Sequence, residues 1–270
     1  MRDIAFGQFY PAKSLLHRLD PRAKILLLIV FIVMVFCTAN YYSLLLVILG
    51  VFSVVLLSKV PLRLYFKSLK MIIVIVLITS FLNLFYGTGE PVISWGFIKI
   101  TLEGINNAIF VSVRILSLIL ISSTLTFTTS PTDLTDALER LMKPLTVFKV
   151  KVHEIAMMMT IALRFVPLLL EETDKIMSAQ KARGADMESG NLIQRIKALV
   201  PVLIPLFVSA FRRAYELAVA MECRCYQGGE GRTRMKSLHL HTRDYLSILV
   251  VIILIVGVVL CNVLLPQAVR

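Results

Sequence analysis

The sequence predicts an all-α integral membrane protein with about five transmembrane helices and, between the fourth and the fifth, a set of long amphipathic helices. Three observations carry this prediction. Apolar residues make up 57% of the 270 residues, and the mean hydropathy is +0.82. They are gathered in blocks long enough to cross a bilayer. The segment 128–243 has helical periodicity with charged residues on one side, which is typical of amphipathic helices.

Apolar blocks place the five spans, and flanking polar residues set their limits. The predicted spans are 24–39, 41–57, 69–86, 105–127 and 245–265. The first two are short for a span of roughly 20 residues. One helix through both would be about 50 Å long, however, against a hydrocarbon core of about 30 Å. We therefore predict a tight turn at residues 39–41.

Basic residues set the predicted orientation. Of the 29 Lys and Arg residues, 26 lie in 1–24, 58–70 and 128–243. The positive-inside rule makes these segments cytoplasmic, so the N-terminus is expected inside and the C-terminus outside. The first twenty residues lack the short apolar core of a cleavable signal peptide. The net charge of +12 does not indicate nucleic-acid binding, because the cations flank apolar blocks and do not alternate with aromatic residues.

Three domains are expected from this pattern: an N-terminal membrane domain at 1–127 with four spans, a cytoplasmic helical domain at 128–243, and the final span at 244–270. In the cytoplasmic domain, Ser130 is a candidate N-cap for a helix that Pro131 opens and Pro144 ends. Two longer helices are predicted at 152–183 and 192–226. We expect them to be partly embedded in the membrane.

No catalytic, cofactor-binding or metal-binding residues are predicted. No glycines fit the phosphate-binding G-x-x-x-x-G-K-[ST] loop. His153 and Glu154 begin an H-E-x-x-H pattern, but Met157 stands where the second histidine belongs, so no zinc site of that kind forms. Cys223 and Cys225 supply only two thiols. Arg114 is the single charge inside a predicted span, and we interpret it as a structural intramembrane charge that bridges helices.

Two short arginine motifs are the strongest candidate site. The two long helices end in Ala182-Arg183-Gly184 and Cys223-Arg224-Cys225. One arginine in a last helical turn is explained by the helix dipole alone. Two such motifs, each with small neighbours, indicate two equivalent tips that enter narrow grooves, where a guanidinium forks onto a carboxylate. A pair of related partner subunits would provide those grooves.

The order and spacing of five blocks resemble the T component (EcfT family) of energy-coupling factor (ECF) transporters, which are ABC-type importers of vitamins and metals. These blocks are SLLHRLDPRAK at 14–24, TTSPTDLTDALER at 128–140, ALRFVPL at 162–168, QKARG at 180–184 and FRRAYELAVAMECRCY at 211–226.

The resemblance implies a non-enzymatic subunit in a prokaryotic cytoplasmic membrane, in which the coupling-helix domain at 128–243 transmits motion. Its implied partners are two ABC-type ATPase subunits, which bind the ATP and Mg²⁺, and one substrate-binding membrane S component. By the same resemblance, the ATPase-docking residues are Ala182, Arg183, Gly184, Cys223, Arg224 and Cys225. Glycine is also common in the family at the place of Cys225.

Two other classes of membrane protein are weighed against this one. A secondary carrier without ATPase partners would need ionisable residues near the bilayer midplane and paired repeats with broken helices. An intramembrane enzyme would need a paired acid set, a Ser–His set or a metal cluster within the spans. Arg114 alone satisfies neither requirement, and the long cytoplasmic helices would have no role in either class.

Overall fold

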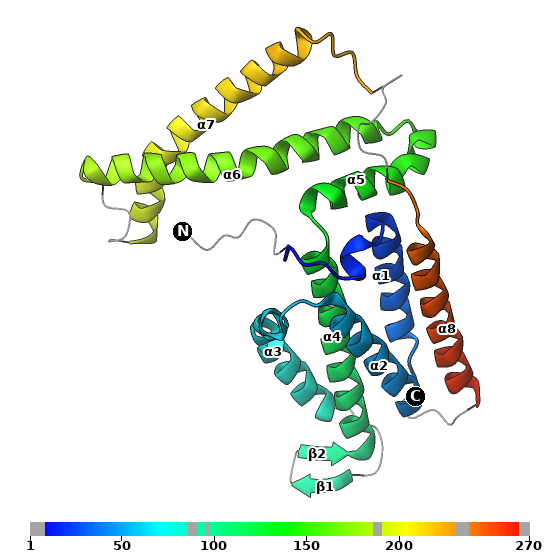
Figure 1. Cartoon of the computed structure of the whole chain (residues 1–270). Helices are drawn as coiled ribbons and strands as arrows, with labels where there is room; N and C mark the ends of the chain where they lie inside the picture. Colours follow the sequence, from blue (N-terminus) through cyan, green and yellow to red (C-terminus); the bar gives the residue numbers. More distant parts are fainter. Residues whose placement is uncertain (1–8, 86–90, 96–97, 186–190, 230–237, 265–270) are drawn as a thin grey trace. The chain divides into compact units, whose positions relative to one another are not determined.

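The computed structural model describes residues 9–85, 91–95, 98–185, 191–229 and 238–264 (Figure 1). The chain divides into two compact units. The bundle unit comprises Gly7–Leu134 and Ser237–Arg270, and the two-helix unit comprises Thr135–Lys236 with Met1–Phe6. The second unit is thus inserted, in sequence, between the fourth and the last helix of the first.

The bundle unit is built from five helices: α1 (Pro21–Phe36), α2 (Tyr41–Ser58), α3 (Leu62–Leu84), α4 (Leu102–Thr128) and α8 (Thr242–Leu264). A single 3₁₀ turn, η1 (Leu16–Arg18), precedes α1. Helix α4 packs against α1, α2 and α3, and α8 packs against α1 and α2. The predicted helical membrane class is confirmed, and so is the tight turn between the first two spans.

One element was not predicted. A short antiparallel hairpin, β1 (Pro91–Trp95) and β2 (Ile98–Thr101), lies in the connection between α3 and α4, where the sequence suggested only a loop. β-branched residues are dense there, which favours strands.

Helices α1, α3, α4 and α8 start earlier than the apolar blocks that predicted them, whereas α2 starts at Tyr41 as predicted. Helix α1 begins at Pro21 because Asp20 caps it, its Oδ1 accepting the Arg22 N–H at 2.9 Å. The last residues of two predicted spans, Tyr86 and Leu265, lie outside the described residues.

Six helices of the described residues are long and apolar enough to cross a membrane: α2, α3, α4, α8 and the two long helices of the other unit. Helix α1, with 16 residues, is not in this set. Length and composition therefore do not separate the predicted spans from the predicted interfacial helices.

The core of the bundle unit is largely apolar and encloses a small cluster of hydroxyl groups. Phe31, Val35, Val47 and Phe127 are among its most buried side chains. The Tyr65 hydroxyl, also buried, lies 3.1 Å from Ser58 Oγ and 2.9 Å from Thr124 Oγ1. These bonds satisfy a hydroxyl that would otherwise destabilise the interior.

Arg114 lies on α4 and reaches the turn between α1 and α2. Its Nη2 donates to Thr38 O at 3.1 Å, and its guanidinium carbon lies 5.7 Å from the centre of the Phe36 ring. This geometry is that of an arginine that joins helices through a backbone carbonyl and an aromatic face.

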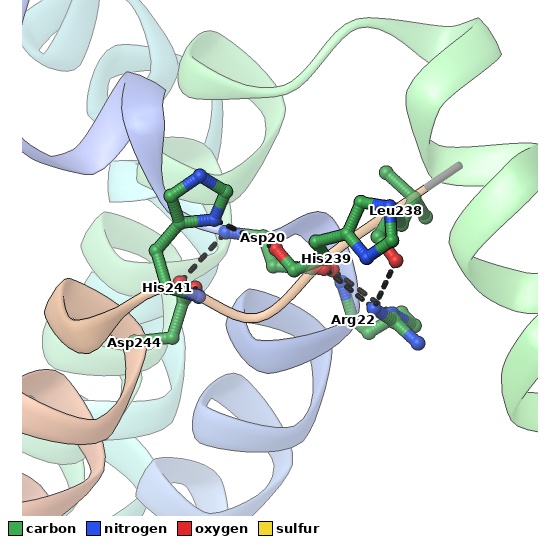
Figure 2. A network of polar contacts seen from close by, with 6 residues as sticks. All are labelled: Asp20, Arg22, Leu238, His239, His241 and Asp244. Carbon is green, nitrogen blue, oxygen red and sulfur yellow. Dashed lines mark hydrogen bonds and ion pairs between the residues drawn. The ribbon is translucent and has the colours of Figure 1, made fainter. Parts of the chain in front are cut away.

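The N-terminal end of α8 is joined to the N-terminal end of α1 by a buried carboxylate (Figure 2). Asp244 Oδ1 accepts the Asp20 N–H at 2.8 Å, while Oδ2 accepts the His241 N–H at 2.7 Å in a capping arrangement. Arg22 completes the network, since its Nη2 donates to Asp20 Oδ2 at 2.7 Å and to Leu238 O at 3.1 Å.

The other end of α8 is joined to the turn between α1 and α2. Asn262 accepts the Ala39 N–H at 3.3 Å and donates to Cys37 O at 2.7 Å. Asn40 Nδ2 donates to Cys261 O at 2.9 Å. Helix α8 is therefore held at both ends by residues more than two hundred positions away in sequence.

The two-helix unit takes its name from α6 (Val152–Ala182) and α7 (Leu192–Glu222). They are preceded by α5 (Pro131–Met142), within which the two units divide, and by the 3₁₀ segment η2 (Lys143–Phe148). The three predicted helices are confirmed. Ser130 Oγ accepts the Asp133 N–H at 3.1 Å as the predicted cap, and α5 gives way to η2 just before Pro144.

Candidate functional site

Helix α6 ends in a Schellman motif with Arg183 at the C-cap. The Ala185 N–H donates to Gln180 O at 3.0 Å, and the Gly184 N–H donates to Lys181 O at 3.0 Å. This pattern requires a left-handed residue after the cap. Gly184 provides it, with φ of +86°.

Helix α7 ends in the same motif with Arg224 at the C-cap. The Tyr226 N–H donates to Met221 O at 3.0 Å, and the Cys225 N–H donates to Glu222 O at 2.8 Å. Cys225 takes the left-handed position, with φ of +54°. Arg183 and Arg224 thus occupy equivalent positions, and the backbone turns away in the same manner directly after each arginine.

Both tips are accessible. All six residues of the two motifs are exposed. Within the described part of the chain, neither the Arg183 nor the Arg224 guanidinium makes a hydrogen bond or ion pair, and the thiols of Cys223 and Cys225 are free. In Figure 1, the two helices cross and their C-terminal ends point in different directions. The two arginines are therefore separate, exposed cations.

The left-handed residue at each tip gives a test of this geometry. We expect Cys225→Gly to stabilise the end of α7 by about 1 kcal/mol, because an L side chain is penalised at positive φ and glycine is not. Gly184→Ala should destabilise the end of α6 by a similar amount, since open space around its Cβ position leaves only the backbone cost.

Hydrogen exchange of the last-turn amides measures both changes locally. Protection should rise about fivefold in the first variant and fall comparably in the second. Equal protection in the wild type and both variants would show that the two ends do not share this motif.

A polar clamp joins the two helices where they cross. Glu172 of α6 accepts from Ser209 Oγ at 2.6 Å and from Arg213 Nη2 at 2.8 Å, both on α7. Farther along, Gln180 Nε2 donates to Pro201 O at 3.3 Å. Val202 is the one residue of α7 that is buried among those described. The Glu172 contacts are therefore the principal polar tie between the helices.

Sequence reasoning missed this clamp. Glu172 and Arg213 are 41 positions apart and lie on different helices. Each fits the polar side of its own helix, so no periodicity distinguishes the pair from solvated surface charges. Asp244 was also missed, although its spacing from His241 is that of a capping box.

The described residues were also compared with the requirements of a metal site. Across the described residues, no three His, Cys, Asp or Glu side chains gather as a metal-binding group. The candidate site therefore consists of exposed cations at the ends of two helices.

Comparison with known proteins extends the resemblance to nearly the whole chain. A family model described as "Cobalt transport protein" (CbiQ) matches residues 12–235. A protein of Ruminiclostridium cellulolyticum is 51% identical over 260 residues, covering 96% of this chain and 97% of the relative. One from Clostridium kluyveri is 50% identical over 257 residues, covering 94% and 95%.

A Bacillus subtilis protein is 48% identical over 255 residues, covering 94% of this chain and 96% of the relative. All three relatives carry the name "Energy-coupling factor transporter transmembrane protein EcfT". The matched regions include both arginine motifs, all of α6 and α7, and most of the bundle. The chain therefore belongs to the EcfT family, the transmembrane proteins of energy-coupling factor transporters.

Proposed function

We propose that this chain is the coupling subunit of its transporter, carrying ATP-driven motion from two ABC-type ATPase subunits to one substrate-binding S component in the membrane. The observation that carries the proposal is the equivalence of Arg183 and Arg224. Each is exposed at the C-cap of a long helix, with the backbone turning away directly after it. Two equivalent cationic tips suit two related partners.

In this proposal the two arginine tips bind the ATPases, and helices α6 and α7 transmit the motion of the ATPases. Each guanidinium forks onto a carboxylate in a groove of one ATPase. When ATP closes the ATPase pair, the tips move, and α6 and α7 move with them because helices are stiff. Pro167, Pro201 and Pro205 lie within these helices and are candidate bends.

The apolar faces of α6 and α7 are the proposed cradle for the S component. Phe207, Phe211 and Tyr215 on α7 are each more than 60% exposed, and a membrane partner would cover such a surface. The proposed cargo of the whole transporter is a micronutrient, a vitamin or metal ion. ATP and Mg²⁺ bind in the partner ATPases, and this chain contributes no catalytic residue.

Co-purification tests the proposal directly. An affinity-tagged copy of this chain, extracted from its own membrane in mild detergent, should retain two ATPase subunits and one small membrane protein. Purification of the chain without any ATPase, under conditions that preserve other membrane complexes, would favour a secondary carrier.

The orientation of the chain is a separate prediction. We expect the N-terminus and residues 128–243 on the cytoplasmic side and the C-terminus outside, because 26 of 29 basic residues lie in the segments assigned to the cytoplasm. In a background without native cysteines, a cysteine at Ser189, which lies outside the described residues, should react with a membrane-impermeant maleimide only after the cells are opened. A cysteine at Thr88 should react in intact cells. The opposite result at either position would reject this orientation.

A further inference from the structure

An apolar groove of about 280 Å³ opens between four helices of the bundle unit and the 3₁₀ turn η1. Leu28, Phe31, Val54, Leu125, Val250 and Leu254 are among its lining residues, and they come from α1, α2, α4 and α8. Of these helices, α2, α4 and α8 are long and apolar enough to cross a membrane, and α1 is a predicted span. Whatever molecule occupies this groove must therefore suit a hydrocarbon environment.

The charged groups of the groove are concentrated at one end. Lys24 lies in the first turn of α1, Thr128 ends α4 and Arg243 lies in the first turn of α8, and all three line the groove. This is also the end at which Asp20 and Asp244 join α1 to α8, and the end that the charge pattern assigns to the cytoplasmic face. The groove therefore has an apolar interior and a cationic mouth at a membrane surface.

Of the two cations, Arg243 is the one available to a ligand. Lys24 is buried, and its Nζ already donates to Thr128 O at 2.9 Å and to Thr129 Oγ1 at 3.1 Å. Arg243 is exposed, and within the described residues its guanidinium has no hydrogen bond or ion pair. The neighbouring Asp244 forms no ion pair with Arg243, and each of its carboxylate oxygens accepts a backbone N–H.

We propose that this groove holds one anionic phospholipid, with an acyl chain among the apolar side chains and the phosphate at Arg243. Water does not suit the interior, because an ordered water needs two to four polar partners. The bilayer supplies acyl chains at high local concentration. Basic pockets between transmembrane helices on the cytoplasmic side suit anionic headgroups. The proposal does not depend on the ATPase partners.

The charge part of the proposal is tested on the purified full-length chain with Arg243→Gln. The protein is incubated with phosphatidylglycerol or phosphatidylcholine of identical acyl chains, and retained lipid is counted by native mass spectrometry. We expect one retained phosphatidylglycerol and about a tenfold loss in the variant, because a charge-assisted hydrogen bond to phosphate is removed. Arg63→Gln is the matched control, an exposed arginine at the start of α3 that does not line the groove.

The groove itself is tested with tryptophan on α8. Val250 lines the groove and Val256 does not, although both are 50% exposed. Val250→Trp should displace the lipid, and Val256→Trp should leave it bound. Any of three results would overturn the proposal. These are an equal loss of lipid in the test and control variants, equal retention of the two lipids, and no retained lipid.

A photoreactive residue at Val250 identifies the occupant in native membranes. Adducts with the mass of an anionic phospholipid support the proposal. A crosslink to a membrane protein would show that the groove is a protein-docking site and would overturn it.

Discussion

We expect the double substitution Arg183→Glu and Arg224→Glu to abolish association with the ATPases while leaving the membrane helices inserted. In the proposed complex each guanidinium lies against carboxylates, so a glutamate there creates a like-charge contact that costs several kcal/mol at an interface. The fold should tolerate both changes, because the two side chains are exposed and their guanidinium groups make no hydrogen bond or ion pair within the described residues. The measurement is pull-down of both ATPases from membranes.

The control keeps the change of charge and moves it away from the tips. Arg195 and Arg212 are exposed on α7, and Arg195→Glu with Arg212→Glu reverses the same number of charges. This control should retain both ATPases. Each single tip variant should weaken the complex less than the double variant does. Undiminished recovery of both ATPases by the double tip variant would refute the docking assignment.

The second large effect is expected at the polar clamp between α6 and α7. Arg213→Glu places two carboxylates together where Glu172 now receives two hydrogen bonds. If the helices transmit force as one body, this change should let them slip at their crossing. We expect the complex to assemble and hydrolyse ATP, because both tips remain, while substrate uptake falls at least about tenfold, as the loss of a charge-assisted tie of about 1.5–3 kcal/mol suggests.

The reciprocal variant makes this test specific. Exchange of the pair, Glu172→Arg with Arg213→Glu, should recover a large part of the uptake, and Arg212→Glu, one position away and exposed, should have little effect. Uptake and ATPase rate are measured on the same reconstituted samples. The crossing of α6 and α7 would serve docking and not transmission if uptake fell only in proportion to assembly. The same would follow if the exchanged pair did not restore uptake.

Much of the fold could be predicted from local sequence signals. The apolar blocks located the spans, and Pro131 and Pro144 located the limits of α5, because a proline suits the first turn of a helix and disrupts its interior. The turn at Asn40 followed from bilayer thickness and from the basic residues on both flanks. The hairpin after α3 was missed because its strands are short and lie within a connection expected to be irregular.

The candidate site was only partly visible. Sequence analysis placed both arginine motifs at helix ends, but it extended the second helix to residue 226, whereas α7 ends at Glu222 and leaves Arg224 at the C-cap. Glycine signals a left-handed residue, whereas Cys225 at φ of +54° does not. The Glu172 clamp and the Asp244 network depend on pairs that are distant in sequence, and one sequence carries no local trace of such pairs.

The fastening of α8 at both ends has a consequence for how the protein is made. Residues 237–264 leave the ribosome after the whole two-helix unit has been synthesised, yet Asp244 and Asn262 complete contacts with Asp20, Ala39 and Cys37 from the beginning of the chain. During translation, α1 and α2 therefore wait in the bilayer with those groups unmatched. The bundle can therefore be completed only after α8 has been synthesised, and we expect a chain that stops before α8 to be degraded even though both arginine motifs are present.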